Sequence, residues 1–310
     1  MDLKQLRALV TVAETGNVTK AADLLHIVQP AISRQLRLLE EDLGVTLFDR
    51  SRHGMALTEA GITMVEYAKR ILTEVDRAKA EIKPVQGSVG GIVTIGLLPS
   101  VADLLSGPIL SAMQKKYPGI RVRITVGYSG HLPKWLEAGE VDFALLYDLK
   151  PTPLLNVTPI LEESLWVVGS PAHKLRQNKP VPFSWLVKQE VVLPSPHHGL
   201  RLLVDQASSL MKYELNVSAE TNALSVQKSM VLSGHSVTVL PAVAVVDDIK
   251  RGLLTAAPIK EPAIQRKIVL ALPANRQTTL PAQCTIPLLV QCMKDAVKRG
   301  SWPSAKWLHE

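Results

Sequence analysis

The N-terminal fold of this chain is decided by residues 17–44, which read NVTKAADLLHIVQPAISRQLRLLEEDLG. The pattern predicts a first helix over 18–25, in which Ala21 and Ala22 are small enough to let another helix approach closely. A second helix is predicted to follow a tight turn and to end before Gly44, because glycine commonly follows the last helical residue. The stretch therefore predicts a pair of packed helices.

The predicted second helix has two chemically different faces. It begins near Gln29 and Pro30, since a proline in the first turn costs no helical hydrogen bond. Apolar residues recur at steps of three and four and predict one buried face, which consists of Ile32, Leu36, Leu39 and Leu43. The opposite face carries side chains that donate hydrogen bonds to base edges or phosphates: Gln29, Ser33, Arg34 and Arg37. This is the pattern of a helix-turn-helix that reads the major groove, although an ordinary helical hairpin with a polar outer face fits this stretch equally well.

A short β-hairpin is predicted after the two helices. Apolar segments at 47–50 and 57–58 flank Ser51-Arg-His-Gly54. They indicate a two-stranded wing that carries Arg50 and Arg52 near its tip.

With this wing, the first 65 residues resemble the LysR-type transcriptional regulators. The matching residues are Leu6-Arg7-Ala8-Leu9, Ala21-Ala22 with Leu25, Gln29-Pro30-Ala31-Ile32-Ser33, Leu38-Leu39-Glu40, Leu43-Gly44, Leu47-Phe48 with Arg50, and Leu57-Thr58 with Ala60-Gly61. The resemblance implies a winged helix-turn-helix that binds double-stranded promoter DNA. The residues it implies at the DNA are Gln29, Pro30, Ser33, Arg34, Arg37, Arg50 and Arg52. One position departs from the family, which usually has serine or threonine before the Gln-Pro pair; Val28 stands there, so the helix start lacks that cap.

Composition excludes several classes of protein. The chain has 310 residues and 46% hydrophobic content, which predicts a globular protein of two or three domains. Aromatic residues make up only 4%, so stacking on unpaired bases is a poor candidate for the binding mode. The start lacks the layout of a signal peptide, no apolar run suffices to cross a membrane, and two cysteines suit a reducing compartment. We therefore expect a cytoplasmic protein without a membrane partner.

The net charge of +7 does not come from the N-terminal region. Residues 1–90 contain 12 lysines and arginines and 12 aspartates and glutamates, so the whole excess lies in the remaining 220 residues. The argument for DNA binding therefore rests on where individual arginines point. The basic excess of the C-terminal part fits either an anionic ligand or ordinary solvated surface.

A long helix is predicted from Thr58 to about Pro84. Its apolar seam consists of Val65, Ala68, Ile71, Leu72, Val75, Ala78 and Ile82. Such a seam packs either on its own domain or on a partner helix. The family resemblance implies antiparallel pairing with a second subunit, hence a homodimer, and a homotetramer made of two dimers. The glycine-rich segment Pro84–Gly91 is expected to be a hinge.

From Ile92 the pattern changes to alternating strands and helices. Strands are predicted over 92–97, 120–126, 141–146, 165–168, 191–193, 217–219 and 237–240. Helices are predicted over 99–116, 132–138, 200–211, 222–233, 242–250 and 284–299. Alternation of this kind predicts an α/β fold with parallel sheets covered on both faces.

The resemblance implies that this part is a two-lobed effector domain similar to a periplasmic binding protein. The chain would cross into the second lobe near 162 and return near 267 through the apolar run Lys267–Leu272. The expected domains are a winged helix-turn-helix over 1–58, a linker helix and hinge over 59–87, lobe I over 88–161 and 267–310, and lobe II over 162–266. Within the family, Ile95–Ser100 and Asp142–Asp148 look most like the nitrogen-assimilation-control branch.

A ligand site is expected between the lobes. Ligands of open α/β sheets bind beyond the carboxyl ends of the strands, where helix N-termini attract anions. The residues expected to contact the effector are Ser100, Val101, Tyr128, Ser129, Tyr147, Ser195, His197 and Thr221. Ser100 and Asn222 fit a plain capping role as well. Asp148 would disfavour a nearby anion unless it forms a salt bridge or the ligand carries an amine.

No motif for catalysis or a cofactor is present. His197 and His198 are adjacent and have no carboxylate or cysteine at ligand spacing, so we expect no metal. Cys284 and Cys292 lie about 12 Å apart along a predicted helix, too far for a disulfide. No nucleophile elbow, phosphate loop or dinucleotide fingerprint occurs, so no cofactor is expected. The first hypothesis is a regulator, not an enzyme, with DNA, a small effector and RNA polymerase as partners. The alternative is a solute-binding module or α/β enzyme with an unrelated helical N-terminal domain.

Overall fold

The chain divides into two compact units, which are described separately. The computed structural model describes residues 1–51, 54–82 and 89–308. Unit 1 contains Met1–Ile92 with Glu137–Glu140, and unit 2 contains Val93–Leu136 with Val141–Glu310. The predicted hinge over Pro84–Gly91 falls largely outside the described residues.

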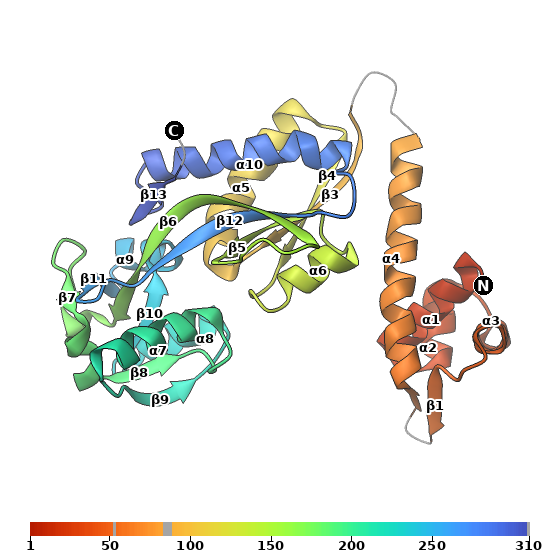
Figure 1. Ribbon diagram of the computed structural model, residues 1–310, viewed down its shortest axis with the longest axis horizontal. Coiled ribbons are helices and arrows are strands. Elements are labelled where there is room, and N and C mark those ends of the chain that lie inside the picture. The colour runs from red at the N-terminus through yellow and green to blue at the C-terminus, as the bar shows by residue number, and fades with distance from the viewer. Residues whose placement is uncertain (52–53, 83–88, 309–310) are drawn as a thin grey trace. The chain divides into compact units, whose positions relative to one another are not determined.

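Unit 1 combines helices with a small β-hairpin (Figure 1). Its elements are α1 (Leu3–Thr15), α2 (Val18–Leu25), α3 (Gln29–Leu43), β1 (Phe48–Ser51), β2 (Gly54–Leu57) and α4 (Glu59–Ile82). β1 and β2 pair antiparallel from Phe48 opposite Leu57 to Ser51 opposite Gly54. The predicted helix pair and wing are therefore confirmed.

Local capping explains where the short helices begin and end. The Asn17 side chain accepts hydrogen bonds from the backbone N–H groups of Thr19 and Lys20, which fixes the start of α2. Val28 provides no side-chain cap for α3, as expected from the sequence. Gly44 ends α3 in the left-handed region at φ 70°, where glycine is favoured.

The core of unit 1 forms around the apolar face of α3. The buried residues of that face are Ile32, Leu36 and Leu39. Leu43 was predicted to join them, but it is 38% exposed. That prediction is wrong because Leu43 lies in the last turn of α3, where it borders an open groove with Val45 and Tyr67.

Part of the apolar seam of α4 packs inside unit 1. Ala68 is fully buried in the core, and three more seam residues pack against it: Val65, Ile71 and Leu72. For these residues the seam packs on its own domain, one of the two alternatives that the sequence left open. Ile62 and Tyr67 on the same helix are more than half exposed, at 53% and 52%.

Unit 2 consists of two lobes joined by two long strands (Figure 1). Lobe I contains β3 (Gly91–Leu97), α5 (Pro99–Lys116), β4 (Ile120–Val126), α6 (Leu132–Ala138), β5 (Phe143–Tyr147), α10 (Leu280–Lys298) and β13 (Ala305–Trp307). Lobe II contains η1 (Pro171–His173), β7 (Val181–Pro182), η2 (Phe183–Lys188), β8 (Glu190–Leu193), α7 (Gly199–Met211), β9 (Asn216–Glu220), α8 (Leu224–Leu232), β10 (Val237–Pro241), η3 (Ala242–Val245), α9 (Val246–Lys250) and β11 (Thr255–Lys260). The joining strands are β6 (Leu155–Gly169) and β12 (Gln265–Pro273).

The sheet of unit 2 is mixed, which corrects the prediction of parallel sheets. Its order is β4-β3-β5-β12-β6-β10-β8-β9. β3 pairs parallel with β5, and β8 pairs parallel with β9 and β10, as the alternating pattern predicts. β12 is antiparallel to both β5 and β6, and β10 is antiparallel to β6. The reason is that β6 carries the chain out of lobe I and β12 brings it back beside β6.

The observed bounds of several elements also differ from the predicted ones. β6 begins at Leu155, ten residues before the predicted strand. The prediction missed its first half because that half mixes polar residues with Pro159 and lacks an apolar run. α10 begins at Leu280 because Thr279 caps it and Pro281 fits its first turn. Residues 242–250 form the short helices η3 and α9. Among the described residues, no helix combines the length and apolar character needed to cross a membrane.

Candidate functional site

Unit 1 presents a polar surface on α3. Four of the residues predicted to contact DNA are exposed: Gln29, Pro30, Arg34 and Arg37. Ser33 is half-buried and accepts a hydrogen bond of 3.0 Å from Gln29 Nε2. Arg37 pairs with Glu41 at 3.4 Å, an exposed contact that holds the guanidinium weakly. Arg34 has no hydrogen bond or ion pair with any other described residue, so its donors are available.

The wing packs against the turn between α1 and α2 in the same unit. The Met55 N–H donates to the carbonyl oxygen of Gly16 at 3.0 Å, which connects β2 to the turn before α2. Arg50 lies on β1 opposite Met55. The side chain of Arg50 and all of Arg52 lie outside the described residues.

Unit 2 contains a cavity between its two lobes, which opens to solvent and encloses about 400 Å³ of empty space when the open part is included. Lobe I and β12 contribute Leu98, Pro99, Ser100, Tyr128, Tyr147 and Arg266. Lobe II contributes Pro194, His198, Leu200, Asn222, Leu224, Gln227, Leu240 and Pro241. The cavity is thus lined largely by the loops that follow the strands and by the helix turns after them, in keeping with the rule for α/β sheets.

Three of the predicted effector residues line the cavity: Ser100, Tyr128 and Tyr147. Ser129 lies behind them and donates a hydrogen bond of 2.9 Å to the Tyr147 hydroxyl. Val101 does not line the cavity, because it is fully buried on the inner side of α5. Ser100, which precedes it in the sequence, faces the cavity from the first turn of α5.

The predicted residues of lobe II miss the cavity by one position at two places. His197 is exposed while His198 lines the cavity, and Thr221 accepts from the Ala223 N–H at 3.3 Å while Asn222 lines it. Ser195 donates to Asn222 Oδ1 at 3.0 Å from both its hydroxyl and its backbone N–H. In irregular loops the direction of a side chain has no fixed period, so the sequence identified the loops and not the facing residue.

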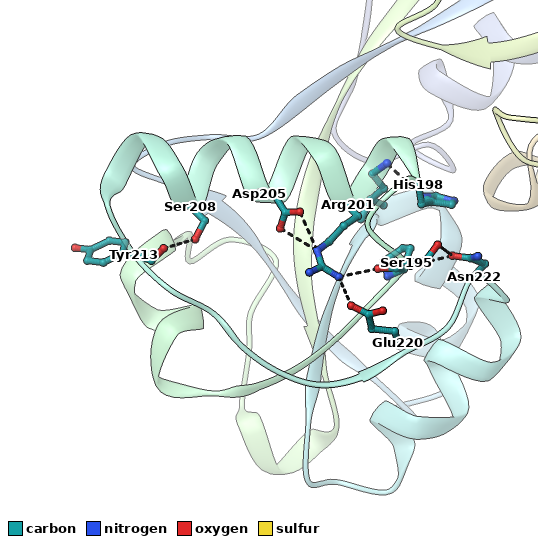
Figure 2. Close-up of polar contacts among 10 residues, drawn as sticks. Ser195, His198, Arg201, Asp205, Ser208, Tyr213, Glu220 and Asn222 are labelled. Atoms are coloured by element: carbon teal, nitrogen blue, oxygen red, sulfur yellow. Dashed lines mark hydrogen bonds and ion pairs between the residues drawn. The ribbon is translucent and has the colours of Figure 1, made fainter.

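The loop of lobe II is held in place by Arg201, as Figure 2 shows. The Arg201 side chain is only 13% exposed and lies between two carboxylates, with Nε at 2.9 Å from Asp205 and Nη1 at 2.7 Å from Glu220. Nη1 also donates to the Pro194 carbonyl at 3.0 Å. The start of the cavity loop is therefore tied to both α7 and β9.

A buried ion pair contributes its arginine to the cavity wall, and neither of its residues was among the predicted site residues. Arg266 on β12 is opposite Glu163 on β6, with exposed fractions of 3% and 0%. Glu163 Oε1 lies 2.7 Å from Arg266 Nε and 2.6 Å from Nη2. Its other oxygen accepts from the Trp302 indole at 2.8 Å. The signal in the sequence was weak, because each strand carries two adjacent charged residues, Glu162-Glu163 in β6 and Arg266-Lys267 in β12.

Arg266 also contacts two of the predicted effector residues. Its Nη2 donates to the Ser100 hydroxyl at 3.1 Å, and its guanidinium lies 4.6 Å from the centre of the Tyr147 ring. Asp148, which follows Tyr147, is exposed and does not line the cavity. Its carboxylate accepts from the Lys267 N–H at 2.9 Å; although the residue is exposed, the surrounding chain partly desolvates the carboxyl group and thereby raises its pKa.

His198 faces the cavity as a neutral ring. Its Nδ1 accepts from the Leu200 N–H at 3.2 Å and thereby caps α7, so the ring proton sits on Nε2. Burial lowers the pKa of His198, and the positive charge of Arg266 lowers it further. The neutral ring therefore adds a hydrogen-bond donor to the cavity.

We expect a His198→Asn variant to remove a pH-dependent part of the stability. Because the folded ring binds its proton less tightly than the unfolded one, the unfolded chain takes up a proton as the pH falls through the ordinary value of 6.5. The wild type therefore loses stability there, whereas asparagine caps α7 without titrating. Melting temperatures of both full-length proteins, taken between about pH 8 and about pH 5.5, measure this. A difference between them that stays constant with pH would contradict the assignment.

Comparison with known proteins identifies both units. Residues 3–62 match the family described as "Bacterial regulatory helix-turn-helix protein, lysR family", and residues 86–294 match "LysR substrate binding domain". The N-terminal and C-terminal parts thus both match LysR-family models. This removes the alternative in which the helical N-terminal domain is unrelated to the rest of the chain.

Three similar proteins extend along nearly the whole chain. The nitrogen assimilation regulatory protein nac of Escherichia coli K12 is 28% identical over 97% of this chain and 99% of its own length. A probable nitrogen assimilation transcriptional activator of Synechococcus elongatus is 31% identical over 91% of each chain. The structure of full-length CbnR complexed with its target DNA is 23% identical, covers 96% of this chain and all of that one, and has a TM-score of 0.70, which shows a shared fold. The chain therefore belongs to the LysR family of transcriptional regulators, with an N-terminal helix-turn-helix and a C-terminal effector-binding domain.

Proposed function

We propose that this protein binds promoter DNA through α3 and the wing and changes its effect on transcription when a small anion occupies the cavity of unit 2. The observation that carries the proposal is the exposed row of donors on α3 in a family helix-turn-helix, with Arg34 unengaged. The CbnR structure, which was solved on its target DNA, supports the same use of the same fold. Gln29, Pro30, Ser33, Arg34, Arg37, Arg50 and Arg52 are the proposed DNA contacts.

The proposal includes the assembly and the site of action. The protein acts as a homodimer or homotetramer in the cytoplasm, recruits RNA polymerase and catalyses no reaction. Its domains are the winged helix-turn-helix over 1–58, the linker over 59–87, lobe I over 88–161 and 267–310, and lobe II over 162–266. A ligand acts by binding one arrangement of the lobes better than another, since only such a difference shifts a conformational equilibrium.

The Arg34→Ala variant tests the DNA-binding face. Duplexes selected from a random pool by the full-length protein supply the specific site. If Arg34 reads a base, the variant binds that site more weakly by about 1–3 kcal/mol and binds random DNA almost unchanged. Fluorescence anisotropy on both duplexes at one salt concentration measures this.

The matched control is Arg176→Ala, which removes an exposed arginine from a loop of unit 2. It is expected to bind both duplexes as the wild type does. An equal loss on selected and random DNA would assign Arg34 to a phosphate. A pool that yields no enriched sequence would reject specific DNA binding.

A further inference from the structure

The polar side of the cavity is rich in hydrogen-bond donors. Ser100 and Tyr128 contribute hydroxyls, His198 contributes its Nε2–H, and Arg266 contributes its guanidinium. Among the described lining residues there is no aspartate or glutamate. Gln227 supplies an amide oxygen as an acceptor, since its nitrogen donates to Thr238 at 3.4 Å. A ligand that contributes acceptors, above all an anionic one, matches this wall.

The two members of the buried ion pair differ in their access to the cavity. Arg266 lines the cavity, whereas Glu163 does not and has no exposed surface. Glu163 occupies the Nε and Nη2 side of the guanidinium. An arginine has five N–H donors, and the two on Nη1 have no partner among the described residues. Both N–H groups of Nη2 already donate, one to Glu163 and one to Ser100, so the Nη1 edge of the guanidinium is the part left for a ligand, beside the Ser100 hydroxyl.

Backbone N–H groups at the start of α5 add further hydrogen-bond donors beside this edge. α5 starts at Pro99 without a side-chain cap, and the N–H of Ser100 forms no hydrogen bond with another described residue. Free N–H groups and the positive end of the helix dipole favour a negative charge at this point. The start of α5 therefore adds to the attraction for an anion that the buried side chain of Arg266 already provides at the same place.

The charge balance limits the ligand to one negative charge at this edge. Because Glu163 already neutralises the formal charge of Arg266, only hydrogen bonds and the helix dipole offset even a single anionic charge, and a second one would have nothing further to offset it. Beyond the edge, the cavity is lined largely by apolar side chains, including Leu98, Leu224 and Leu240. The occupant therefore has one charged end and an apolar body.

We propose that Arg266 is the anion-recognition residue of the cavity and that the effector belongs to the small monocarboxylates. The carboxylate accepts from Nη1 of Arg266 and from the Ser100 hydroxyl, and its apolar body packs against the leucines named above. This inference rests on the proposed function, because it names the class of the effector that the regulator senses.

The sharpest test is Glu163→Gln in the full-length protein. Glutamine still accepts from the Trp302 indole but leaves the charge of Arg266 uncompensated beside the cavity. The probes are acetate, hexanoate and benzoate, each compared with its primary amide at equal concentration, and the readout is the dissociation constant from thermal shift titrations. For each carboxylate the variant is expected to bind about 10- to 150-fold more tightly than the wild type, the range of one charge-assisted hydrogen bond. The amides are expected to bind alike to both proteins.

The double variant Glu163→Gln/Arg266→Gln is the matched control, because it keeps a hydrogen-bonded pair and removes both charges. It is expected to bind no carboxylate better than the corresponding amide. Carboxylate affinity that is unchanged in Glu163→Gln, absent from both it and the wild type, or retained in the double variant would overturn the proposal. If Glu163→Gln does not fold, the double variant alone decides between these outcomes.

Failure of this inference is distinguishable from failure of the proposed function. Binding of the wild type to its selected duplex is measured with the same protein preparation. Specific DNA binding together with no preference for carboxylates would reject the role of Arg266 and leave the regulator intact. If the wild type shows no specific DNA binding, the proposed regulator function is rejected, whatever the carboxylate titrations give.

Discussion

Replacing Arg266 with methionine is expected to lower the free energy of unfolding of unit 2 by about 3–5 kcal/mol, because it leaves Glu163 charged, buried and without its partner. For a unit of this size the melting temperature falls by about 2–4 °C for each kcal/mol. Calorimetry of the full-length protein measures the effect. Carboxylates do not restore the lost stability, since the uncompensated charge is now negative and lies out of reach of the cavity.

Two variants bracket this result. Glu163→Gln/Arg266→Gln removes both charges together and is expected to cost much less than Arg266→Met alone, because no charge remains unpaired. Arg176→Met removes an exposed arginine and is expected to change the stability by no more than about 0.5 kcal/mol. A loss for Arg266→Met no larger than that of Arg176→Met would show that the pair contributes nothing to the fold.

Replacing Gly61 with alanine is expected to displace the wing from α4. A Cβ atom at Gly61 would lie 2.0 Å from the carbonyl oxygen of Leu47 and 3.0 Å from the Leu57 side chain. The same Leu47 oxygen accepts from the Thr58 N–H at 3.0 Å, so the backbone cannot yield without losing that bond. Overpacking of this kind costs about 1–3 kcal/mol or more, and affinity for the selected DNA duplex is expected to fall because the wing moves. Urea unfolding and fluorescence anisotropy measure the two effects.

Gly130→Ala is the control for this change. Nothing lies within 4 Å of a Cβ atom at Gly130, and the residue is exposed. Its replacement is expected to leave stability unchanged or to raise it by about 0.4–1 kcal/mol, through the smaller entropy of the unfolded chain. If Gly61→Ala behaves as Gly130→Ala does, the close approach of the wing to α4 is not a constraint.

The parts of the fold that the sequence predicted are those with local causes. Asn17 caps α2, Gly44 ends α3, and α6 was predicted with its observed bounds, because the deciding residues lie within a turn of the element. The antiparallel course of β12 was not predictable in this way. It depends on β6 and β12 being neighbours in the sheet, and their paired residues are about a hundred positions apart in the sequence.

In the candidate site, too, the residues with local signals were predicted and the one that depends on distant contacts was not. Ser100, Tyr128 and Tyr147 were identified because each follows a predicted strand, where the α/β fold places its ligands. Arg266 was missed because its significance depends on Glu163, a residue 103 positions earlier, and on the register that sets them opposite each other. Neither strand taken alone indicates which of its two adjacent charged residues is buried.

The order in which Glu163 acquires its partners has a consequence for synthesis on the ribosome. The buried core of the helix-turn-helix is drawn from residues between Leu6 and Ala68, so it is complete early in translation. Glu163 emerges with β6, but Arg266 follows 103 residues later and Trp302 139 residues later. At typical rates of about 5–20 residues per second, its carboxylate waits about 5–20 seconds for Arg266 and about 7–28 seconds for Trp302. The nascent protein is thus able to fold its DNA-binding part well before its ligand cavity has a closed wall.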